Sequence, residues 1–486
     1  MKTLYLSLLA LLATAMVQAQ GFTTTTLISG LQYPVAFDVA PNGRFFITEK
    51  GDGGISTAGQ KSRIQVYSAA GTLSGTFYNL SDSTNSDGER GVLGIALDPA
   101  FATNHYVYVY YNHRRSGDER IRLLRFTEAA NVGTNPLLIF DLDVADNIPG
   151  NHVGGNLHFR PGEPGKIYFT LGDLGPNQTN PTANYANKLT NPYGKILRIN
   201  KDGTIPTDNP FYDNGNPLTG NCDWIWSYGH RNPFDFCFGP NDSLYCSENG
   251  LTTWDEVNLV RKGGFYGWAD CEGYYLNSST TATCNVAGAI PPIADWGPPP
   301  ALTGIMFYSG TAWPSLANHL LVADYNQGKI HDCVLGNAPY YNTVTGKTEL
   351  GDFSSDGLTT LRQSADGCIY AMDGGYTTNG KIYKICPLAT GISERSSSAL
   401  SLRVYPNPAG KSSAVTVEVT RPEAQSLCVQ VCDMYGKLLM TDMAVAGTGK
   451  TLIPLDIQGF AHGLYFVQLK DAQSRQLMGT VKLVVE

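Results

Sequence analysis

One histidine and two charged residues occupy comparable places in the sequence, each next to a predicted strand. His152 lies in GNHVGGNLHF (residues 150–159) before a hairpin that ends at Asp173, and Arg231 lies in SYGHRNPFDF (residues 227–236) before the next hairpin. The pKa of histidine is close enough to neutrality for its ring to accept a hydroxyl proton. An arginine stabilises the negative charge that develops on the oxygen, and an aspartate fixes the imidazole tautomer. Together the three residues predict proton abstraction from an alcohol.

This interpretation competes with a simpler one, in which His152 is a hydrogen-bonded loop residue. The glycines beside it, Gly154 and Gly155, are interpreted as letting a ligand approach the backbone next to the imidazole. Removal of a hydroxyl proton is not an oxidation, and a hydride acceptor has to come from a cofactor. The sequence contains no Gly-rich strand–helix fingerprint for a nicotinamide. A redox role therefore requires a cofactor of another kind.

The elements that must position these residues form a repeat. A turn, an apolar run and a terminal polar residue recur six times, and most copies are followed by a second short strand. Hairpins at roughly 50–80-residue spacing predict an all-β fold with a six-bladed β-propeller over residues 20–387, whereas a β-sandwich does not explain six similar hairpins. Propellers bind ligands at their axis, and the inserts at residues 174–192 and 269–300 are expected to be loops over one face. The six terminal residues are Glu49, Asn112, Asp173, Glu248, Asp324 and Asp373.

The two ends of the chain differ from the repeat. Residues 1–19 combine Lys2, an apolar core and small residues before a cleavage point, which predicts a secretory signal peptide. Residues 388–400 are small and polar and predict a linker, and residues 401–486 predict a small C-terminal β-sandwich. In that segment YPNPA, GLYFVQL and KLVV resemble the C-terminal sorting domain of type IX secretion cargo, with an ordinary adhesion module as the alternative. The resemblance implies export to the cell surface or the medium, with the type IX secretion machinery as a partner.

Composition narrows the class of partner. Charged residues make up 16% of the chain and the formal net charge is −8, so a nucleic-acid partner is not expected. No stretch after the signal peptide reaches the length of a transmembrane segment. The ten cysteines of an exported chain permit disulfides, with Cys271–Cys284 as the most plausible local pair. Cys428 and Cys432 lie roughly 13 Å apart on an extended strand, too far to bridge, so we expect them to be free or buried thiols.

Seven stretches, in order along the chain, resemble the soluble pyrroloquinoline quinone (PQQ)-dependent sugar dehydrogenases, the glucose/sorbosone dehydrogenase family. They are GERGVLGIALDPAF, NHVGGNL, KIYFTLGD, YGKILRIN, YGHRNP, DEVNLVRKGGFYGW and LTGIMFYSG. The resemblance implies oxidation of the C1 hydroxyl of an aldose to a lactone, with PQQ as hydride acceptor and a further electron acceptor as partner. It implies His152 as the base, Asp173 as its support, Arg231 as a contact of substrate and cofactor, Asn232 and Gln178 as cofactor contacts, and Glu89 at the position of a sugar-binding glutamine.

The resemblance also implies Ca²⁺, which polarises the quinone carbonyl. By position the ion is held by the main-chain carbonyls of Gly250 and Leu251, and oxygen ligands are those that Ca²⁺ prefers. Asp255 and Glu256 match a second, structural Ca²⁺ site. Adjacent acids on a strand point to opposite faces, so solvated charges remain the alternative for that pair.

The sequence departs from the family where the carboxylates of PQQ are bound. The family uses a lysine in blade five, where this chain has Asn326 or Gln327, and an Arg-x-Arg pair before the last hairpin, which is missing here. Lys329 and Arg362 lie nearby but out of register. Losing three charge-assisted contacts, at roughly 1.5–3 kcal/mol each, weakens cofactor binding by orders of magnitude. Two alternatives to a dehydrogenase therefore stay open: a non-redox propeller that binds carbohydrate or protein at the cell surface, and a metal-dependent lactone hydrolase, which needs carboxylates around an axial Ca²⁺.

Overall fold

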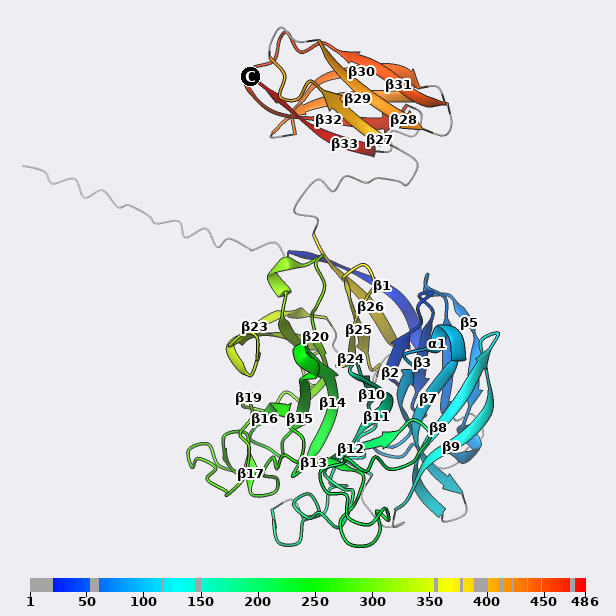
Figure 1. The fold of residues 1–486 in the computed structure, drawn as a ribbon, viewed down its shortest axis with the longest axis vertical. Coiled ribbons are helices and arrows are strands. Elements are labelled where there is room, and N and C mark those ends of the chain that lie inside the picture. Colours follow the sequence, from blue (N-terminus) through cyan, green and yellow to red (C-terminus); the bar gives the residue numbers. More distant parts are fainter. Residues whose placement is uncertain are drawn as a thin grey trace, which may run out of the picture. The chain divides into compact units, whose positions relative to one another are not determined.

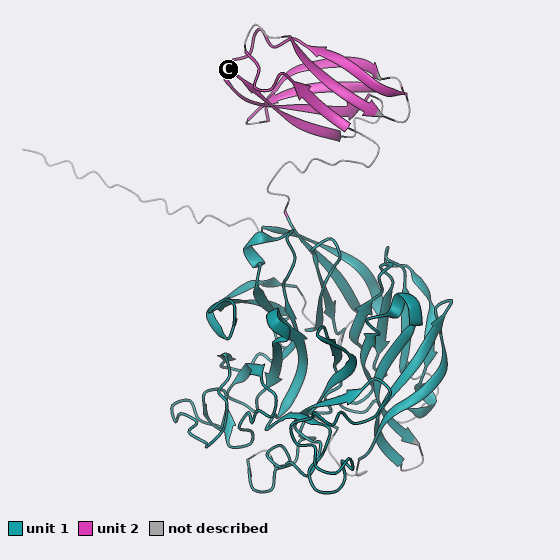
Figure 2. Ribbon diagram, in the orientation of Figure 1, with its two compact units in different colours: residues 1–387 teal, residues 388–486 magenta. Residues whose placement is uncertain are grey.

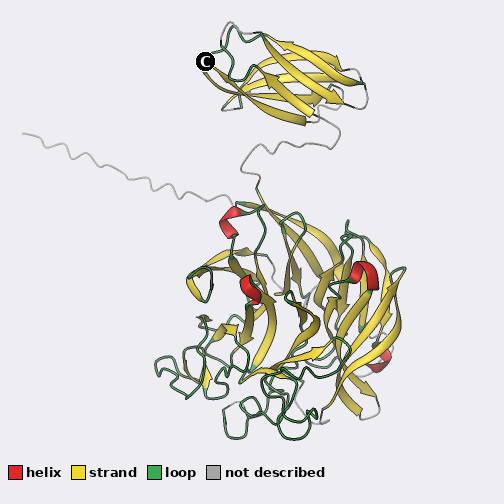
Figure 3. Cartoon of the chain, viewed as in Figure 1, coloured by secondary structure: helices red, strands yellow, loops and turns green. Residues whose placement is uncertain are grey.

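Strands dominate the computed structural model, and the helical elements are short (Figure 3). The structure describes residues 21–52, 61–115, 118–144, 150–177, 179–353, 357–375, 379–388, 401–410, 414–421, 424–434, 436–446, 448–472 and 477–486. The chain divides into two compact units, residues 1–387 and 388–486 (Figure 2). The predicted all-β class is confirmed. The predicted signal peptide lies outside the described residues, as do residues 389–400 of the predicted linker.

The first unit contains six four-stranded antiparallel sheets (Figure 1). The first three consist of β2 (Pro34–Val39), β3 (Phe45–Glu49), β4 (Arg63–Tyr67) and β5 (Leu73–Asn79); β6 (Val92–Leu97), β7 (Tyr106–Arg115), β8 (Asp118–Ala129) and β9 (Val132–Asp143); and β10 (Leu157–Arg160), β11 (Glu163–Leu171), β12 (Lys195–Asn200) and β13 (Ile225–Tyr228). The other three consist of β14 (Asn232–Phe238), β15 (Leu244–Asn249), β16 (Asp255–Val260) and β19 (Ala294–Trp296); β20 (Leu302–Phe307), β21 (His319–Asp324), β22 (Lys329–Gly336) and β23 (Thr343–Asp352); and β24 (Leu358–Gln363), β25 (Ile369–Asp373), β26 (Gly380–Pro387) and β1 (Phe22–Leu31). The short helical elements are α1 (Phe101–Asn104) and the 3₁₀ turns at Ser81–Ser83, Pro240–Asp242 and Pro314–Leu316.

The sheets follow one another in a closed ring. The first strand of each sheet contacts the first strand of the next in the order β2, β6, β10, β14, β20 and β24, and β24 contacts β2 again. Strand β1 pairs with β26, with Phe22 opposite Pro387, so the last sheet joins the two ends of the unit. Each of the six predicted hairpins is present, and so is the second strand that follows it. Because β2 and β14 are three steps apart in this ring of six, their sheets lie on opposite sides of the centre.

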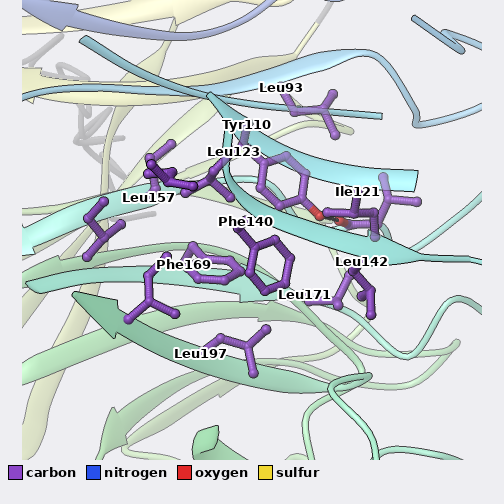
Figure 4. Packing of buried hydrophobic residues seen from close by; sticks show 14 of the residues in the cluster. Leu93, Tyr110, Ile121, Leu123, Phe140, Leu142, Leu157, Phe169, Leu171 and Leu197 are labelled. Atoms are coloured by element: carbon purple, nitrogen blue, oxygen red, sulfur yellow. Dashed lines mark hydrogen bonds between the residues drawn. The ribbon is translucent and has the colours of Figure 1, made fainter. Parts of the chain in front are cut away.

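Apolar side chains fill the space between neighbouring sheets. Figure 4 shows Tyr110 of β7, Phe140 of β9 and Phe169 of β11 within one such cluster. The ring centroids of Phe140 and Phe169 are 4.9 Å apart in an edge-to-face arrangement, which aromatic pairs prefer. Strand β6 (VLGIAL) is buried on both faces, which explains why its sequence is a continuous apolar run rather than an alternation. Burial of each Leu or Phe in such a cluster contributes about 1.5–3 kcal/mol.

The polar residues that end the six repeated runs are all buried. Each accepts a hydrogen bond from a main-chain N–H near the start of a sheet or in the turn that follows the run. A buried N–H without a partner costs about 1–3 kcal/mol, so these residues are first of all structural, and chemistry requires a further group beside one of them. The pairs are Glu49 with Gln32 (2.7 Å), Asn112 with Gly91 (3.1 Å), Asp173 with Gly175 (2.8 Å), Glu248 with Arg231, Asp324 with Gln327 (2.7 Å) and Asp373 with Gly375 (2.9 Å).

The second unit contains two antiparallel sheets that share one core. Val417 of the first sheet and Val429 and Val467 of the second are buried in it. Along the strand VTVEVTR, alternate valines reach this core, which is the pattern of a sheet buried on one face. The strands are β27 (Ser401–Tyr405), β28 (Val415–Arg421) and β31 (Gly449–Leu455) in one sheet, and β30 (Leu438–Ala446), β29 (Gln425–Asp433), β32 (Gly463–Asp471) and β33 (Leu477–Val485) in the other.

The insert at residues 269–300 is more ordered than the predicted loop. Strands β17 (Cys271–Glu272) and β18 (Tyr275–Leu276) form a two-stranded sheet within it. Its last part supplies β19, the fourth strand of the fourth sheet. The insert therefore leaves that sheet and returns to complete it, which brings residues 267–277 beside the end of β15.

The predicted disulfide between Cys271 and Cys284 is present, and a second one joins Cys368 to Cys386. Cys428 and Cys432 are free and buried, as predicted. In the part of the chain that the structure describes, no helix is both long enough and apolar enough to cross a membrane.

Candidate active site

His152 and Asp173 form a buried, hydrogen-bonded pair. The hairpin of β10 and β11 brings them together, because His152 precedes the first strand and Asp173 follows the second. His152 Nδ1 lies 2.6 Å from Asp173 Oδ1, and the two side chains are 6% and 0% exposed. The φ of His152 is +54°, in the left-handed region, where a non-glycine residue is held only by its surroundings. Gly172 is part of those surroundings, since a Cβ there would lie 2.3 Å from the carbonyl oxygen of His152.

The carboxylate of Asp173 is surrounded by donors. Its Oδ2 accepts hydrogen bonds from Trp268 Nε1 (2.7 Å) and Asn184 Nδ2 (3.0 Å). Burial alone would raise the pKa of Asp173, but the hydrogen bond and charge of His152, with the bonds from Asn184 and Trp268, hold that pKa below its ordinary value. An ionised carboxylate only accepts, so the proton between the pair belongs to His152 Nδ1. Nε2 then carries the lone pair, and no described residue hydrogen-bonds to it.

Arg231 is joined to this pair through Trp268 and through the main chain. The centre of its guanidinium lies 5.5 Å from the Trp268 ring centroid, and its carbonyl oxygen accepts the N–H of Asp173 (2.8 Å). Nη1 donates to the carbonyl oxygen of Asn249 (3.0 Å). Burial lowers the pKa of Arg231, against the opposing effect of Asp173 and other nearby carboxylates, but an arginine stays protonated. The structure therefore places a fixed positive charge beside the His–Asp pair.

A cavity of about 300 Å³ opens where the first strands of the six sheets converge. Its size is within the range of small-molecule sites. Residues 153–156, directly after His152, line it, and so does Asn232, directly after Arg231. His152 and Arg231 therefore lie immediately beside the wall, although neither is itself a lining residue. Residues in the first strand of each sheet, or directly before it, contribute to the lining: Pro34 and Val35, Leu93, Asn156, Asn232 and Phe234, Thr303, and Thr359.

Glu89 is the predicted substrate contact, and that role stays a prediction. It lines the cavity, its side chain is exposed, and Oε2 accepts the main-chain N–H of His152 (2.6 Å). The carboxylate thus helps to hold the backbone of His152 at the edge of the cavity.

The two glycines after His152 are explained differently from the sequence interpretation. Both have positive φ values, +64° at Gly154 and +126° at Gly155. A Cβ at Gly154 would lie 2.3 Å from the carbonyl oxygen of Thr170, and one at Gly155 would lie 2.7 Å from Leu93 Cβ. Close packing of the main chain against the neighbouring strands therefore requires glycine here, whether or not a ligand approaches.

The positions that carry the cofactor-binding cations in the family do not supply any here. Asn326 and Gln327 are exposed and do not line the cavity. Lys329 Nζ pairs with Glu349 (2.8 Å), and Arg362 pairs with Asp235 at 3.5 Å. These four residues therefore place no cation in the cavity, in agreement with the departure from the family that the sequence shows.

The loop after β15 has the features of a main-chain cation site. The N–H groups of Leu251, Thr252, Thr253 and Trp254 all donate to one oxygen of Glu272, at 2.7, 3.0, 3.0 and 3.1 Å. No described residue donates to the carbonyl oxygens of Gly250 or Leu251. Gly250 is required in this loop, because a Cβ would lie 1.7 Å from the carbonyl oxygen of Trp254. A rigid loop whose carbonyl oxygens accept no hydrogen bond from the described residues fits the oxygen ligands that Ca²⁺ prefers.

Asp255 and Glu256 face different partners. Asp255 accepts the N–H groups of Gly250 (2.8 Å) and Leu302 (2.9 Å), whereas Glu256 accepts Asn258 Nδ2 and the N–H of Gly273, both at 2.8 Å. Burial raises the pKa of Asp255 to about 6, although its main-chain donors oppose the shift. The structure does not bring the two carboxylates to one point, and a second calcium site at this pair stays a prediction.

Sequence reasoning missed Trp268, Asn184, Glu272 and Lys50. Trp268 and Asn184 hold Asp173, Glu272 holds the loop at 250–254, and Lys50 lines the cavity. Trp268 was visible in GGFYGW, but nothing in that motif shows where its indole points. The predicted cofactor contact Gln178 lies outside the described residues.

Residues 31–384 match the family described as Glucose / Sorbosone dehydrogenase. The chain belongs to the glucose/sorbosone dehydrogenase family. Residues 403–486 match the Secretion system C-terminal sorting domain. Both family resemblances noted in the sequence are thereby confirmed, and the second indicates export by type IX secretion to the cell surface or beyond it.

Known members of this family include sugar dehydrogenases. Quinoprotein glucose dehydrogenase B of Acinetobacter calcoaceticus is 31% identical over 300 residues, which cover 56% of this chain and 59% of that protein. Aldose sugar dehydrogenase of Escherichia coli (strain K12) is 28% identical over 313 residues, covering 62% of this chain and 78% of that protein. The chain thus spans less than two thirds of the Acinetobacter protein.

Among solved structures, the PQQ-bound aldose sugar dehydrogenase of Streptomyces coelicolor superposes with a TM-score of 0.57. The two are 21% identical, and the match covers 76% of this chain and 99% of that one. This likeness supports a shared fold for the first unit.

Proposed function

We propose that this protein is an exported, PQQ- and Ca²⁺-dependent aldose dehydrogenase that oxidises the C1 hydroxyl of a sugar to a lactone. The proposal includes a signal peptide at residues 1–19, a six-bladed β-propeller at 20–387, a linker at 388–400 and a β-sandwich sorting domain at 401–486. The single observation that carries it is the open Nε2 of His152, held by Asp173 beside a cavity at the centre of the ring.

The names of the relatives supply the substrate class and the cofactor. The Acinetobacter relative is a quinoprotein glucose dehydrogenase, the Escherichia relative acts on aldose sugars, and the Streptomyces structure contains PQQ. Carried to this chain, these properties require a base, a positive charge for the substrate oxygen and room for a planar ligand. The cavity and its neighbours provide all three.

His152 acts as the base. Its Nε2 takes the proton of the C1 hydroxyl, and the imidazolium that forms is stabilised by the carboxylate of Asp173. Asp173 keeps Nδ1 protonated throughout, because its other donors hold it ionised. Arg231 stabilises the negative charge on the substrate oxygen, and the low exposure of the site strengthens this interaction. Glu89 contributes a carboxylate oxygen for a second sugar hydroxyl.

The residues present offer partners for Ca²⁺ and for the quinone end of PQQ, whereas the positions that bind its carboxylates in the family place no cation in the cavity. When bound, PQQ supplies the hydride acceptor that side chains lack, and Ca²⁺ supplies a charge that polarises its carbonyl. Asn232 and Asn249 line the cavity beside Arg231. The Asn249 amide is bonded to Asn232 Nδ2 and to the carbonyl oxygen of Leu302, so Asn232 is the proposed contact of the quinone end. Gly250 and Leu251 offer their main-chain carbonyl oxygens to the ion, and Gln178 is a further proposed cofactor contact.

A reconstitution assay tests the proposal. Purified protein is mixed with PQQ, CaCl₂, a panel of aldoses and a dye acceptor, and dye reduction is followed together with the absorbance of bound PQQ. We expect dye reduction with at least one aldose, its loss on calcium chelation and its return on adding Ca²⁺. The matched control is His152→Asn, which retains PQQ binding without turnover. Absence of both PQQ binding and dye reduction, together with sugar binding on a glycan array, would instead identify a non-redox carbohydrate-binding propeller.

A further inference from the structure

Lys50 is the one basic residue among the described residues that line the central cavity. It directly follows β3 in the first sheet. Its Nζ donates to the carbonyl oxygens of Ser86 (2.8 Å) and Gly88 (2.9 Å). An ammonium group carries three protons, so one donor is left over. Lys50 forms no ion pair with any carboxylate in the part of the chain that the structure describes.

Packing fixes the position of this side chain. A Cβ at Gly91 would lie 2.4 Å from Lys50 Cγ and 2.5 Å from its carbonyl oxygen, so the stem of Lys50 runs closely over Gly91. The two carbonyl acceptors belong to the segment just before Gly91, which leads into β6. The stem and the ammonium group of Lys50 are therefore both fixed, so the side chain loses little conformational freedom when a ligand binds.

Lys50 lies across the ring from Arg231 and Asn232. Lys50 belongs to the sheet that begins with β2, whereas Arg231 and Asn232 lie at the start of β14. These two sheets are three steps apart in the cyclic order of six. A planar ligand that touches Asn232 at one end and extends across the axis points its other end toward the first sheet.

We propose that Lys50 binds a carboxylate of the cofactor on the side of the cavity opposite Arg231 and Asn232. This inference rests on the proposed function and deepens it. In this proposal Lys50, directly after β3 of the first sheet, supplies a positive charge that other positions supply in the family. Asn326, Gln327, Lys329 and Arg362 do not line the cavity, so no described residue at those positions competes for this role.

The charge of Lys50 is also regulated by its surroundings. Burial lowers the pKa of Lys50 to about 8, against the opposing charges of Asp87, Glu89 and Asp52. Only the ammonium form attracts an anion, so affinity for the cofactor is highest below this pKa and falls as the pH rises above it.

Direct binding measurements test the inference without relying on turnover. The Kd for PQQ is measured by quenching of tryptophan fluorescence at fixed Ca²⁺ and without sugar, for the wild type, Lys50→Gln, Lys50→Arg and Lys329→Gln. We expect Lys50→Gln to weaken binding roughly 10- to 100-fold, the range for one charge-assisted contact. Lys329→Gln, which removes an ion-paired lysine outside the cavity, should leave the Kd unchanged. Between pH 7 and 10 wild-type binding should weaken, whereas Lys50→Arg should bind with nearly constant affinity.

Each outcome decides between the two proposals. A wild type that binds PQQ as tightly as Lys50→Gln, with the same pH dependence, overturns the role of Lys50 and leaves the dehydrogenase proposal standing. A wild type that does not bind PQQ at any pH overturns both. If Lys50→Gln does not fold, as judged by thermal unfolding, the pH dependence of the wild type against Lys50→Arg remains decisive.

Discussion

Two of the histidine–carboxylate pairs of the first unit lie in its third and fourth sheets, which are neighbours. In the third sheet His152 Nδ1 lies 2.6 Å from Asp173, and in the fourth His230 Nδ1 lies 2.8 Å from Glu248. In both, the carboxylate belongs to the repeated polar position at the end of a run. The difference is at the other ring nitrogen. His230 Nε2 lies 2.9 Å from Ser227 Oγ, whereas Nε2 of His152 has no partner among the described residues.

The surroundings of the two rings also differ. His230 is fully buried and stacks on Tyr266, with ring centroids 4.7 Å apart. Its partner Glu248 also accepts a hydrogen bond from Asn258 Nδ2 (3.1 Å). Glu248 and Glu256 form a buried acidic pair, in which burial and the charge of Glu248 raise the pKa of Glu256 well above its ordinary value. His152 instead lies next to the cavity wall. The open Nε2 of His152 supports the proposal that this ring acts as the base, whereas both nitrogens of His230 are bonded within the fold.

The largest effect on activity should come from replacing His152, whose Nε2 has no partner among the described residues. We expect His152→Asn to lower kcat on the order of 10⁴-fold, at the upper end of the range for a general base, with little change in stability because only one hydrogen bond is lost. Steady-state dye reduction and urea unfolding, followed by tryptophan fluorescence, measure the two quantities. All six tryptophans lie in the first unit, so the fluorescence reports on that unit. Near-normal kcat in this variant would contradict the assignment of the base.

The next effect should come from inverting the tautomer of the same ring. In Asp173→Asn the new amide donates toward His152 Nδ1, so Nε2 is protonated in most molecules and cannot accept the substrate proton. We expect kcat to fall on the order of 10³-fold, less than for His152→Asn because a minority tautomer keeps the lone pair on Nε2. The matched control is Glu248→Gln in the other pair, which should lower stability more than kcat. The assignment fails if both variants lose activity equally.

Disrupting the His230–Glu248 pair should change the stability of the protein more than its activity. We expect His230→Ala to lower the free energy of unfolding by about 3 kcal/mol, because Glu248 and Ser227 lose buried partners. The kcat of the folded fraction should stay within about tenfold of the wild type, a loss small beside the range for removing a base. Urea unfolding and activity per folded molecule test this. A variant with unchanged stability and no activity would show that His230, rather than His152, is the reactive ring.

The smallest effect should come from Trp268, which links Asp173 to Arg231. Trp268→Phe removes one donor from Asp173 and should lower kcat roughly tenfold, as is typical for residues that orient a reactive group. Loss of that donor raises the pKa of Asp173, so the acid limb of the pH–rate profile should move to higher pH. Trp296→Phe is the matched control, because Trp296 packs beside His331 and Lys347, away from the pair. A purely structural role for Trp268 would lower stability and leave the pH profile in place.

Much of this fold could be predicted because its signals are local. The alternation of apolar residues, the turns and the sixfold recurrence of one hairpin specify strands and their sequence neighbours. His152 and Asp173 flank one hairpin, so their approach is a consequence of local pairing. The disulfide between Cys271 and Cys284 follows from a similarly short separation.

The rest of the site depends on side chains brought together over long distances in the sequence. Strand periodicity and turn residues act between neighbours, so the all-β class, the family and the His152–Asp173 pair could be recognised from the amino-acid order. Only the tertiary structure showed that Trp268, 95 residues away, donates to Asp173, that His230 is closed while His152 is open, and that Lys50 lines the cavity. The physical reason is that closure of the ring and the return of long inserts determine where a side chain points, and no local pattern records that direction.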